Sequence, residues 1–309
     1  MGWLARLRAG PEPDARRAAP STLAVFLAPA LLLYAGFMVY PVLRTFYNSV
    51  HTIKPQGIQE FVGLANFSEL LTTDPVFWKA VGNTAYFAVI ATIADVLGGL
   101  LIALCLFSRP PFAKLLRVIW FTPVLMSYVV VGVIWVWIYD YDWGLANAVL
   151  RWLGLGAWEQ SWLGHPSTAL GSVMVTHIWK WLGFNMIIFL AALSALPAEV
   201  LGAAELDNCG WFARLVYIII PMLRPTIVNL TVLSFIGKMM IFDLVWIMTG
   251  GGPLWSTETV STYVYKRAFD WNTFDLGYPS AIAVLWFIII MAFVIVMTRL
   301  LRQRDKLEF

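Results

Sequence analysis

The sequence predicts an all-α integral membrane protein with six transmembrane helices. Of its 309 residues, 60% are hydrophobic and 13% are charged, against about 25% charged in an ordinary soluble domain. The apolar residues gather in windows of roughly 20 residues, which is long enough to cross the ~30 Å hydrocarbon core of a bilayer. This composition excludes a water-soluble globule.

Six apolar windows follow one another along the chain, and we expect each to form one membrane-spanning helix. They cover Leu23–Val42, Val81–Phe107, Leu116–Tyr139, Ala169–Leu193, Ile219–Trp246 and Pro279–Leu300. The first has a long apolar run and no small-residue cleavage site closing it, so we interpret it as an uncleaved anchor helix. The windows predict a membrane domain at 22–300 between a poorly ordered tail at 1–21 and a short tail at 301–309.

The lysine and arginine residues predict how the spans are oriented. These residues concentrate on the cytoplasmic side of membrane proteins, in short loops near span ends. Of the 21, 13 lie in the two tails, in the loops at 108–115 and 196–218, or at the adjoining span ends, against 6 on the other side. Both termini and these two loops are therefore predicted to be cytoplasmic, and the large loops at 44–80, 140–168 and 247–278 to lie outside.

The segment at 196–218 is polar, although it connects two apolar windows. Its acidic residues Glu199, Glu205 and Asp207 come early and Arg214 comes late. This order suits the dipole of a short helix that lies at the cytoplasmic surface rather than spanning the bilayer. We expect a soluble partner to contact this segment.

Several blocks of sequence agree, in order and spacing, with one known family. They are FLAPALLLYAGFMVYPVLRTFYNSV, FVGLANFSELL, AVGNTAYFAVI, FTPVLMSYVVVGVIWVWIYDYDWGLANAVL, WKWLGFNMIIFLAALSALP and FDLVWIMTGGGP. From Leu23 to Leu300 the chain resembles the permease subunits of sugar-type ABC importers of the maltose and glycerol-phosphate type. The resemblance implies a type I ABC importer permease fold with a cytoplasmic coupling helix at 196–218.

In this family the coupling loop begins with Glu-Ala-Ala, has a Gly six residues after that Glu, and ends near a Pro. The matching residues here are Gly202, Ala203, Ala204, Asp207, Asn208 and Pro221. Gly202 and Asn208 replace the hallmark Glu and Gly. Asn tolerates a left-handed backbone well, so we expect the turn between two short helices to survive. Glu199 or Glu205 could replace the lost carboxylate, and coupling through this half is hypothesised to be weaker.

Two lysines inside apolar windows are candidates for the transport path, because ionisable groups in the membrane are costly. Lys238 shares a helix face with small and polar residues of the fifth span, and Lys180 lies similarly deep in the fourth. The candidate path residues are Trp179, Lys180, Gly183, Met186, Ser234, Gly237, Lys238 and Ile241. The resemblance places sugar contacts on these same positions of the two spans.

Other interpretations of these residues remain open. Gly183, Gly237 and Ser234 also suit tight helix packing. Lys238 could form an ion pair with Asp243, and Asp95 could neutralise either Lys180 or Lys238. The sequence alone does not decide among these alternatives.

The resemblance also implies the partners of the chain. A second permease subunit, two ATPase subunits carrying ATP and Mg, and an extracytoplasmic solute-binding protein would complete a carbohydrate or polyol importer in a bacterial inner membrane. The GGGP turn lacks the Gly-Lys-Ser/Thr of a phosphate loop, so ATP hydrolysis and its cofactors are expected on another chain.

Other classes of function find little support in the sequence. No catalytic constellation, metal site, disulfide or nucleic-acid surface is predicted, and Cys105 and Cys209 are expected to be small apolar fillers. The remaining alternative is a secondary transporter driven by an ion gradient, for which Asp95 alone is thin support.

Overall fold

The computed structural model describes residues 20–53, 58–271 and 275–302 and divides into two compact units. The first unit ends at Tyr47. Its helices α1 (Pro20–Tyr34), the π-helical turn η1 (Ala35–Val39) and α2 (Tyr40–Ser49) follow one another without a break, and the last two residues of α2 already belong to the second unit. Helix from Val25 to Ser49 is long and apolar enough to span a bilayer, so the first predicted span is confirmed and is longer than expected.

Both predicted tails fall mainly outside the described residues, which begin at position 20 and end at position 302. Where the tails are described, they are helical. Pro20 and Ser21 belong to α1, and the last helix continues to Arg302.

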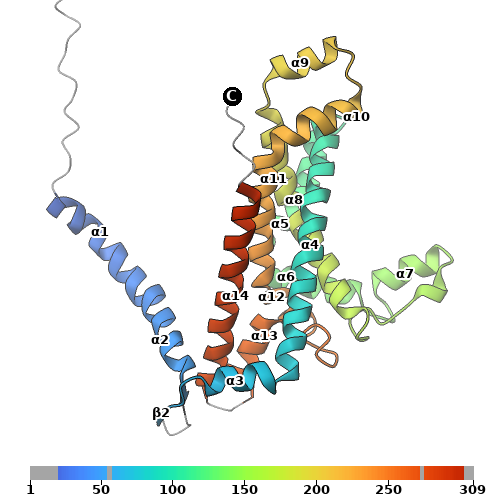
Figure 1. The fold of residues 1–309 in the computed structure, drawn as a ribbon. Helices are drawn as coiled ribbons and strands as arrows, with labels where there is room; N and C mark the ends of the chain where they lie inside the picture. Colours follow the sequence, from blue (N-terminus) through green and yellow to red (C-terminus); the bar gives the residue numbers. More distant parts are fainter. Residues whose placement is uncertain (1–19, 54–57, 272–274, 303–309) are drawn as a thin grey trace, which may run out of the picture. The chain divides into compact units, whose positions relative to one another are not determined.

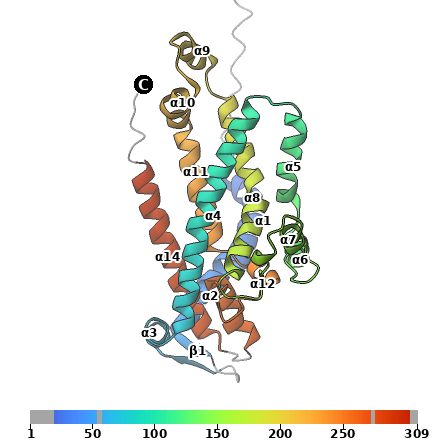
Figure 2. The ribbon, with the colours of Figure 1, turned by 90° about the vertical axis from the view of Figure 1, so that its right-hand side faces the viewer.

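Four long helices form the frame of the second unit. They are α4 (Pro75–Phe107), α8 (Ala169–Ser194), α11 (Ile220–Met239) and α14 (Gly277–Arg302). α4 packs along both α8 and α11, and α14 lies beside α11 (Figures 1 and 2). The sequence defines the start of α4 locally, because the Asp74 carboxylate accepts a hydrogen bond from the Phe77 N–H at 2.9 Å and Pro75 occupies the first turn.

The third predicted span is not one straight helix, which corrects the continuous span expected over Leu116–Tyr139. α5 (Ala113–Leu125) and α6 (Tyr128–Ile138) are bent by 104° at a short break. Pro123 removes a hydrogen bond from the last turn of α5, and Met126 and Ser127 are extended. The Ser127 hydroxyl then accepts from the Val130 N–H and caps α6.

The fifth predicted span is also shorter at its end than the expected Ile219–Trp246. Helix runs from Trp211 to Met239, through α10 (Trp211–Arg214), η3 (Leu215–Ile219) and α11. The chain then breaks, and the separate helix α12 (Asp243–Met248) follows. The apolar window therefore covers two helices, since apolar composition does not reveal a break between buried segments.

Smaller elements gather at the end of the second unit where α4 begins (Figure 1). Strands β1 (His51–Ile53) and β2 (Gln59–Phe61) pair antiparallel with His51 opposite Phe61. The elements α3 (Ala65–Thr72) and α13 (Val260–Tyr265), which η4 (Lys266–Asp270) continues, also lie at this end, whereas α7 (Leu145–Trp152), followed by η2 (Gly156–Trp158), projects from the side of the unit (Figure 1).

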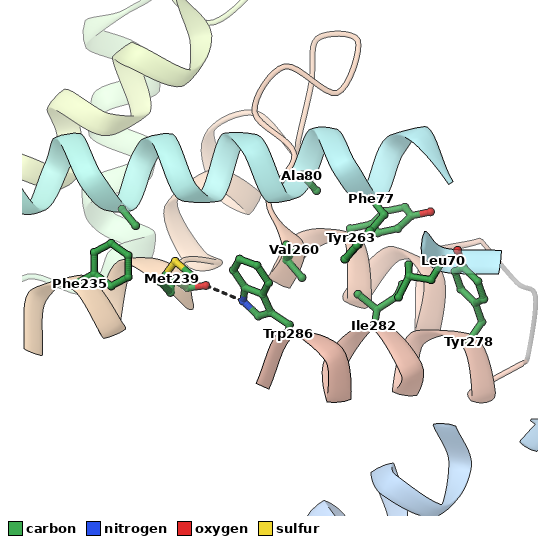
Figure 3. Close-up of a cluster of buried hydrophobic side chains, with 11 residues drawn as sticks. Leu70, Phe77, Ala80, Phe235, Met239, Val260, Tyr263, Tyr278, Ile282 and Trp286 are labelled. Atoms are coloured by element: carbon green, nitrogen blue, oxygen red, sulfur yellow. Dashed lines mark hydrogen bonds between the residues drawn. The ribbon is translucent and has the colours of Figure 1, made fainter. Parts of the chain in front are cut away.

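A buried hydrophobic cluster ties α3, α4, α11, α13 and α14 together (Figure 3). Phe77, Tyr263 and Ile282 are almost completely buried in it. Trp286 of α14 also donates its indole N–H to the carbonyl oxygen of Met239 at 3.0 Å, which fixes the end of α11 where the chain leaves the helix.

The polar 196–218 segment forms two short helices at the opposite end of the unit (Figure 1). α9 (Ala198–Leu206) ends at Asp207, and α10 starts at Trp211. Asn208 between them has φ of 51°, in the left-handed region that was expected for this position. The two cysteines differ from expectation, since Cys105 is exposed and Cys209 is half-buried.

Candidate functional site

A cavity of about 360 Å³ lies among α4, α6, α8 and α11. Its walls combine aromatic rings, amide and hydroxyl groups, and one acid–base pair. The lining residues are Asp95, Tyr128, His177, Trp181, Phe184, Asn185, Leu233, Ser234, Gly237 and Lys238. A cavity of this size and mixed character suits a small polar molecule with apolar faces.

Asp95 of α4 and Lys238 of α11 form an ion pair in the cavity wall. The Lys238 ammonium nitrogen lies 2.7 Å from Asp95 Oδ2, and the two side chains are 3% and 0% exposed. Of the partners left open by the sequence, Lys238 therefore pairs with Asp95, whereas Asp243 is exposed at the start of α12. A buried charge of this kind needs a close partner, because an isolated charge in the membrane interior is costly.

Aromatic side chains form another wall of the cavity. Trp181 donates its indole N–H to the Tyr128 hydroxyl at 2.8 Å. The His177 ring stacks on Trp181 with ring centroids 6.4 Å apart and meets Phe87 edge-on. These contacts hold the Trp181 and Tyr128 rings in place, and such rings can pack on the C–H surface of a sugar.

Several polar atoms of the wall are buried without a hydrogen-bond partner in the described part of the chain. They include Asp95 Oδ1, Asn185 Oδ1 and His177 Nδ1. Buried polar groups in proteins are almost always satisfied, and these atoms have almost no accessible surface, so a ligand or water could supply the missing partner only after a movement of the wall.

Lys180 lies behind the cavity rather than in its wall. Its ammonium group donates to the carbonyl oxygens of Pro123, Val124 and Met126 at 3.2, 3.3 and 2.6 Å. The same nitrogen lies 4.9 Å from the centre of the Tyr128 ring. Lys180 thus satisfies the free carbonyls at the α5–α6 break and supports the ring that faces the cavity.

The structure separates the eight predicted path residues into two groups. Ser234, Gly237 and Lys238 line the cavity. The others contact neighbouring helices: Trp179 packs on Trp135, Gly183 on the Trp120 backbone, and Met186 and Ile241 in hydrophobic clusters, with Lys180 at the helix break. A role in transport stays a prediction for every member of the set.

The cavity residues outside the predicted path set come mainly from α8, and for two of them, His177 and Asn185, the sequence left contact with a sugar and hydrogen bonding between helices equally open. His177, Trp181 and Asn185 follow one another at intervals of four residues, so they share one helix face. This spacing of polar and aromatic residues could have predicted the cavity-facing side of α8. The residues Trp179, Gly183 and Met186 have similar spacing and predicted a different face of the same helix. Tyr128 could not have been found, because its position depends on the unexpected bend.

At the end of the unit where α4 begins, a second acid–base pair lies beneath the GGGP turn. The Lys266 ammonium lies 2.5 Å from Glu258 Oε2, and the Glu258 side chain is completely buried. Burial raises the pKa of the Glu258 carboxyl, although hydrogen bonds from Lys266 and Thr262 oppose the rise. Asn83 of α4 also donates to the carbonyls of Trp255 and Glu258, which holds the loop against the helix.

The predicted coupling residues lie on and around α9. Ala204 is buried, Glu199, Ala203, Asp207 and Asn208 are exposed, and Gly202 is half-buried at a position where an added Cβ would meet nothing within 4 Å. Glu205 pairs with Arg214 of α10 at 2.6 Å. Pro221 lies in the first turn of α11. Their role in coupling stays a prediction.

The exposed surface near this segment is apolar as well as charged. Leu206 on α9 is 85% exposed, and Trp211, Phe212 and Tyr217 are 65% to 77% exposed at the start of the helix Trp211–Met239, which is apolar enough to span a bilayer. Among the described residues, no group of three or more His, Cys, Asp or Glu side chains is placed to hold a metal ion.

Comparison with known proteins identifies relatives of this architecture. Residues 95–306 match the family described as binding-protein-dependent transport system inner membrane component. The chain is 33% identical to the sulfoquinovosyl glycerol transport system permease protein SmoG of Agrobacterium fabrum, over 91% of this chain and 90% of the relative. It is 30% identical to the trehalose/maltose transport system permease protein MalF of Thermococcus litoralis, over 91% and 93%.

Solved structures support the same fold. A chain in the crystal structure of a bacterial alginate ABC transporter, in complex with an alginate pentasaccharide-bound periplasmic protein, superposes with a TM-score of 0.81 at 21% identity. The match covers 93% of this chain and 96% of the other, so the fold is that of a type I ABC importer permease. The chain therefore belongs to the family of binding-protein-dependent transport system inner membrane components.

Proposed function

We propose that the chain forms one half of the membrane path of an ATP-driven carbohydrate importer. The observation that carries this proposal is the cavity between α4, α6, α8 and α11, which combines aromatic rings with unsatisfied hydrogen-bonding groups. A sugar needs both kinds of contact. The names of relatives support a carbohydrate as the substrate class, since they describe transport of trehalose/maltose and lactose, which are neutral, and of sulfoquinovosyl glycerol, which carries a sulfonate.

In this proposal the α9–α10 end of the unit faces the cytoplasm, together with both termini of the chain. The concentration of Lys and Arg in the tails and in the 108–115 and 196–218 loops supports this orientation. The opposite end, with β1, β2, α3 and α13, then faces outward, where a soluble receptor delivers the sugar.

The proposed assembly contains a second permease and two ATPase subunits, which bind ATP and Mg. The exposed apolar side chains around α9 and α10 provide a surface on which an ATPase can dock. Closure of the ATPases on ATP turns the path outward, and hydrolysis returns it inward. Alternating access of this kind needs two states of the membrane domain that ATP binding populates differently.

Purification of the tagged chain from its native membrane in mild detergent tests the assembly. We expect mass spectrometry to identify a second permease and an ATPase at stoichiometric levels, and the purified complex to hydrolyse ATP. Uptake by cells should fail when ATP is depleted and survive a protonophore at constant ATP. A chain that purifies alone, with uptake sensitive to the protonophore only, would instead support a secondary transporter.

A further inference from the structure

The cavity wall has no net charge. Of the ten described residues that line the cavity, Asp95 and Lys238 are the two that carry charge at pH 7 when histidine is counted as neutral. Their side chains are buried and lie 2.7 Å apart. The pair contributes zero net charge whether the proton resides on the amine or on the carboxyl, so this conclusion does not depend on how the pair shares it.

The neighbouring Lys180 has no free hydrogen-bond donor for an anion in the cavity. An ammonium group has three N–H donors, and Lys180 directs its donors to three carbonyl oxygens at the α5–α6 break. Lys180 is 3% exposed, and its nitrogen lies over the Tyr128 ring. Its charge also meets the negative end of the α5 dipole.

Two of the groups left open in the wall are hydrogen-bond acceptors. Asp95 Oδ1 and Asn185 Oδ1 have no partner among the residues that the structure describes. Both atoms are covered by their neighbours, but the Asp95 carboxylate still repels the charged oxygens of a carboxylate, sulfonate or phosphate, whereas a hydroxyl group carries no charge to be repelled.

From this charge balance we infer that the chain conducts an uncharged polyhydroxy compound, a neutral sugar or polyol, and that the Asp95–Lys238 pair sets this preference against anions. The inference rests on the proposed importer function and narrows its substrate class. The buried pair leaves the wall without net charge, and Lys238 keeps the Asp95 carboxylate tolerable in the membrane.

Substitutions that change the charge of the pair should change the selectivity in opposite directions. Asp95→Asn leaves Lys238 unpaired, so the wall carries a positive charge that attracts anions. Lys238→Met leaves Asp95 unpaired and strengthens the exclusion of anions. The double variant Asp95→Asn/Lys238→Met restores a net charge of zero in the absence of both groups.

The test uses the complete importer with its receptor, reconstituted in liposomes with ATP supplied to the ATPase. Uptake is measured for radiolabelled neutral probes (maltose, lactose, trehalose and raffinose) and for anionic probes (glucuronate, galacturonate and digalacturonate). We expect the unmodified importer to take up one or more neutral probes and to exclude the anionic probes. Asp95→Asn should raise the ratio of anionic to neutral uptake by about tenfold or more.

A matched control is the second buried pair, because it lies outside the cavity. Glu258→Gln also leaves a buried lysine, Lys266, without its carboxylate partner, so it should reduce stability in a similar way and leave the uptake ratio unchanged. If the Asp95→Asn variant does not assemble, the double variant and Lys238→Met are tested instead. The ratio of anionic to neutral uptake in the double variant is expected within about threefold of that of the unmodified importer.

The outcomes separate the inference from the function on which it rests. Uptake of an anionic probe by the unmodified importer at a rate equal to or above that of the neutral probes overturns the inference and leaves the importer function intact. A ratio that stays the same in the Asp95, Lys238 and Glu258 variants overturns the role of the pair. Absence of ATP-dependent uptake of every probe, together with an ATPase rate that the receptor does not stimulate, overturns the proposed function together with the inference.

Discussion

Lys180 of α8 donates a hydrogen bond to the carbonyl oxygen of Met126 at 2.6 Å, and Met126 directly follows the last residue of α5. A helix end inside a membrane leaves carbonyl groups that water cannot satisfy. Lys180 satisfies three of these carbonyl groups with the N–H donors of its ammonium group. The residue is therefore as much a part of the α5–α6 bend as Pro123, although it lies more than 50 positions further along the chain.

Replacing Lys180 should destabilise the bend and the cavity wall together. We expect Lys180→Met to reduce the stability of the protein by about 1 to 3 kcal/mol, because it leaves several buried carbonyls unsatisfied. Lys180→Arg retains the donors and should recover part of the loss. The measurement is unfolding of the purified complex by SDS titration in mixed micelles.

An exposed lysine provides the control for this substitution. Lys114→Met removes the same charge from the first turn of α5 and should leave stability within about 0.5 kcal/mol of the unmodified protein. Equal stability of the Lys180→Met and Lys114→Met variants would show that the bend does not depend on Lys180.

The bend also marks the limit of what the sequence could predict about the fold. Six apolar windows correctly predicted five helices that are long and apolar enough to cross a membrane and one further bent pair, because bilayer thickness sets the length of any apolar crossing. Apolar composition does not distinguish a straight helix from two helices joined by Met126 and Ser127. The contact that stabilises the break comes from Lys180, which is distant in sequence, so no local pattern could reveal it.

Two glycines that looked equivalent in the sequence should respond differently to alanine. An added Cβ at Gly183 would clash with the backbone of Trp120, whereas at Gly237 it would meet nothing within 4 Å. We expect Gly183→Ala to cost about 1 to 3 kcal/mol through displacement of α5. Gly237→Ala should leave folding unaffected and narrow the cavity.

Unfolding and uptake measured on the same preparations distinguish these two effects. Gly183→Ala should lower stability, and Gly237→Ala should alter the apparent KM for the transported sugar at unchanged stability. If the two variants had the same stability, close packing of α5 on α8 at Gly183 would not be an energetic constraint.

The Asp74 carboxylate should make the stability of the protein fall at acid pH, through the end of the unit where α4 begins. Burial opposes ionisation of this carboxyl, but hydrogen bonds from the Tyr263 and Tyr278 hydroxyls and the Phe77 N–H, with the nearby Arg267, lower its pKa below the ordinary 3.8. The Tyr263 hydroxyl lies 2.5 Å and the Tyr278 hydroxyl 2.6 Å from Oδ2. The carboxylate thus joins α4, α13 and α14.

The sign of the pH effect follows from the lowered pKa of Asp74. Its contribution is fully present above pH 3.8 and is lost as the pH falls through the lower value of the folded state. Asp74→Asn should cost about 1 to 2 kcal/mol at pH 7, and the difference from the unmodified protein should shrink below about pH 4. A difference that stays constant down to pH 3 would contradict a role for the charge, and Asp142→Asn at an exposed position is the control.

The candidate site was predictable in part, and the reason differs between its residues. Lys238 stood out because a lysine inside an apolar window is costly, and Ser234 and Gly237 followed from its helix face. Lys180 is also a lysine inside an apolar window, but it lies at the helix break. The presence of a costly charge shows that the charge has a role, and does not show whether that role is in the cavity or in the fold. The choice between Asp95 and Asp243 required the distance between α4 and α11, which the sequence does not contain.

Gly202 is the position where the coupling segment departs most clearly from the family pattern. An added side chain there would meet nothing within 4 Å, so a glutamate fits without displacing a neighbour. It would also replace a glycine inside α9, which favours the helix by roughly 0.5 to 1 kcal/mol. We expect Gly202→Glu to raise the ATPase rate that is coupled to the receptor, or to leave it unchanged.

Gly202→Ala separates the carboxylate from the gain in helix stability, because alanine stabilises α9 without adding a charge. If the carboxylate is what the family pattern needs, Gly202→Glu should exceed Gly202→Ala in coupled ATPase rate and in uptake per ATP hydrolysed. Equal rates for both variants would assign the gain to the helix alone. A sharp loss of transport in both variants would show that a side chain at this position obstructs the docked ATPase, and that Gly202 is required in this permease.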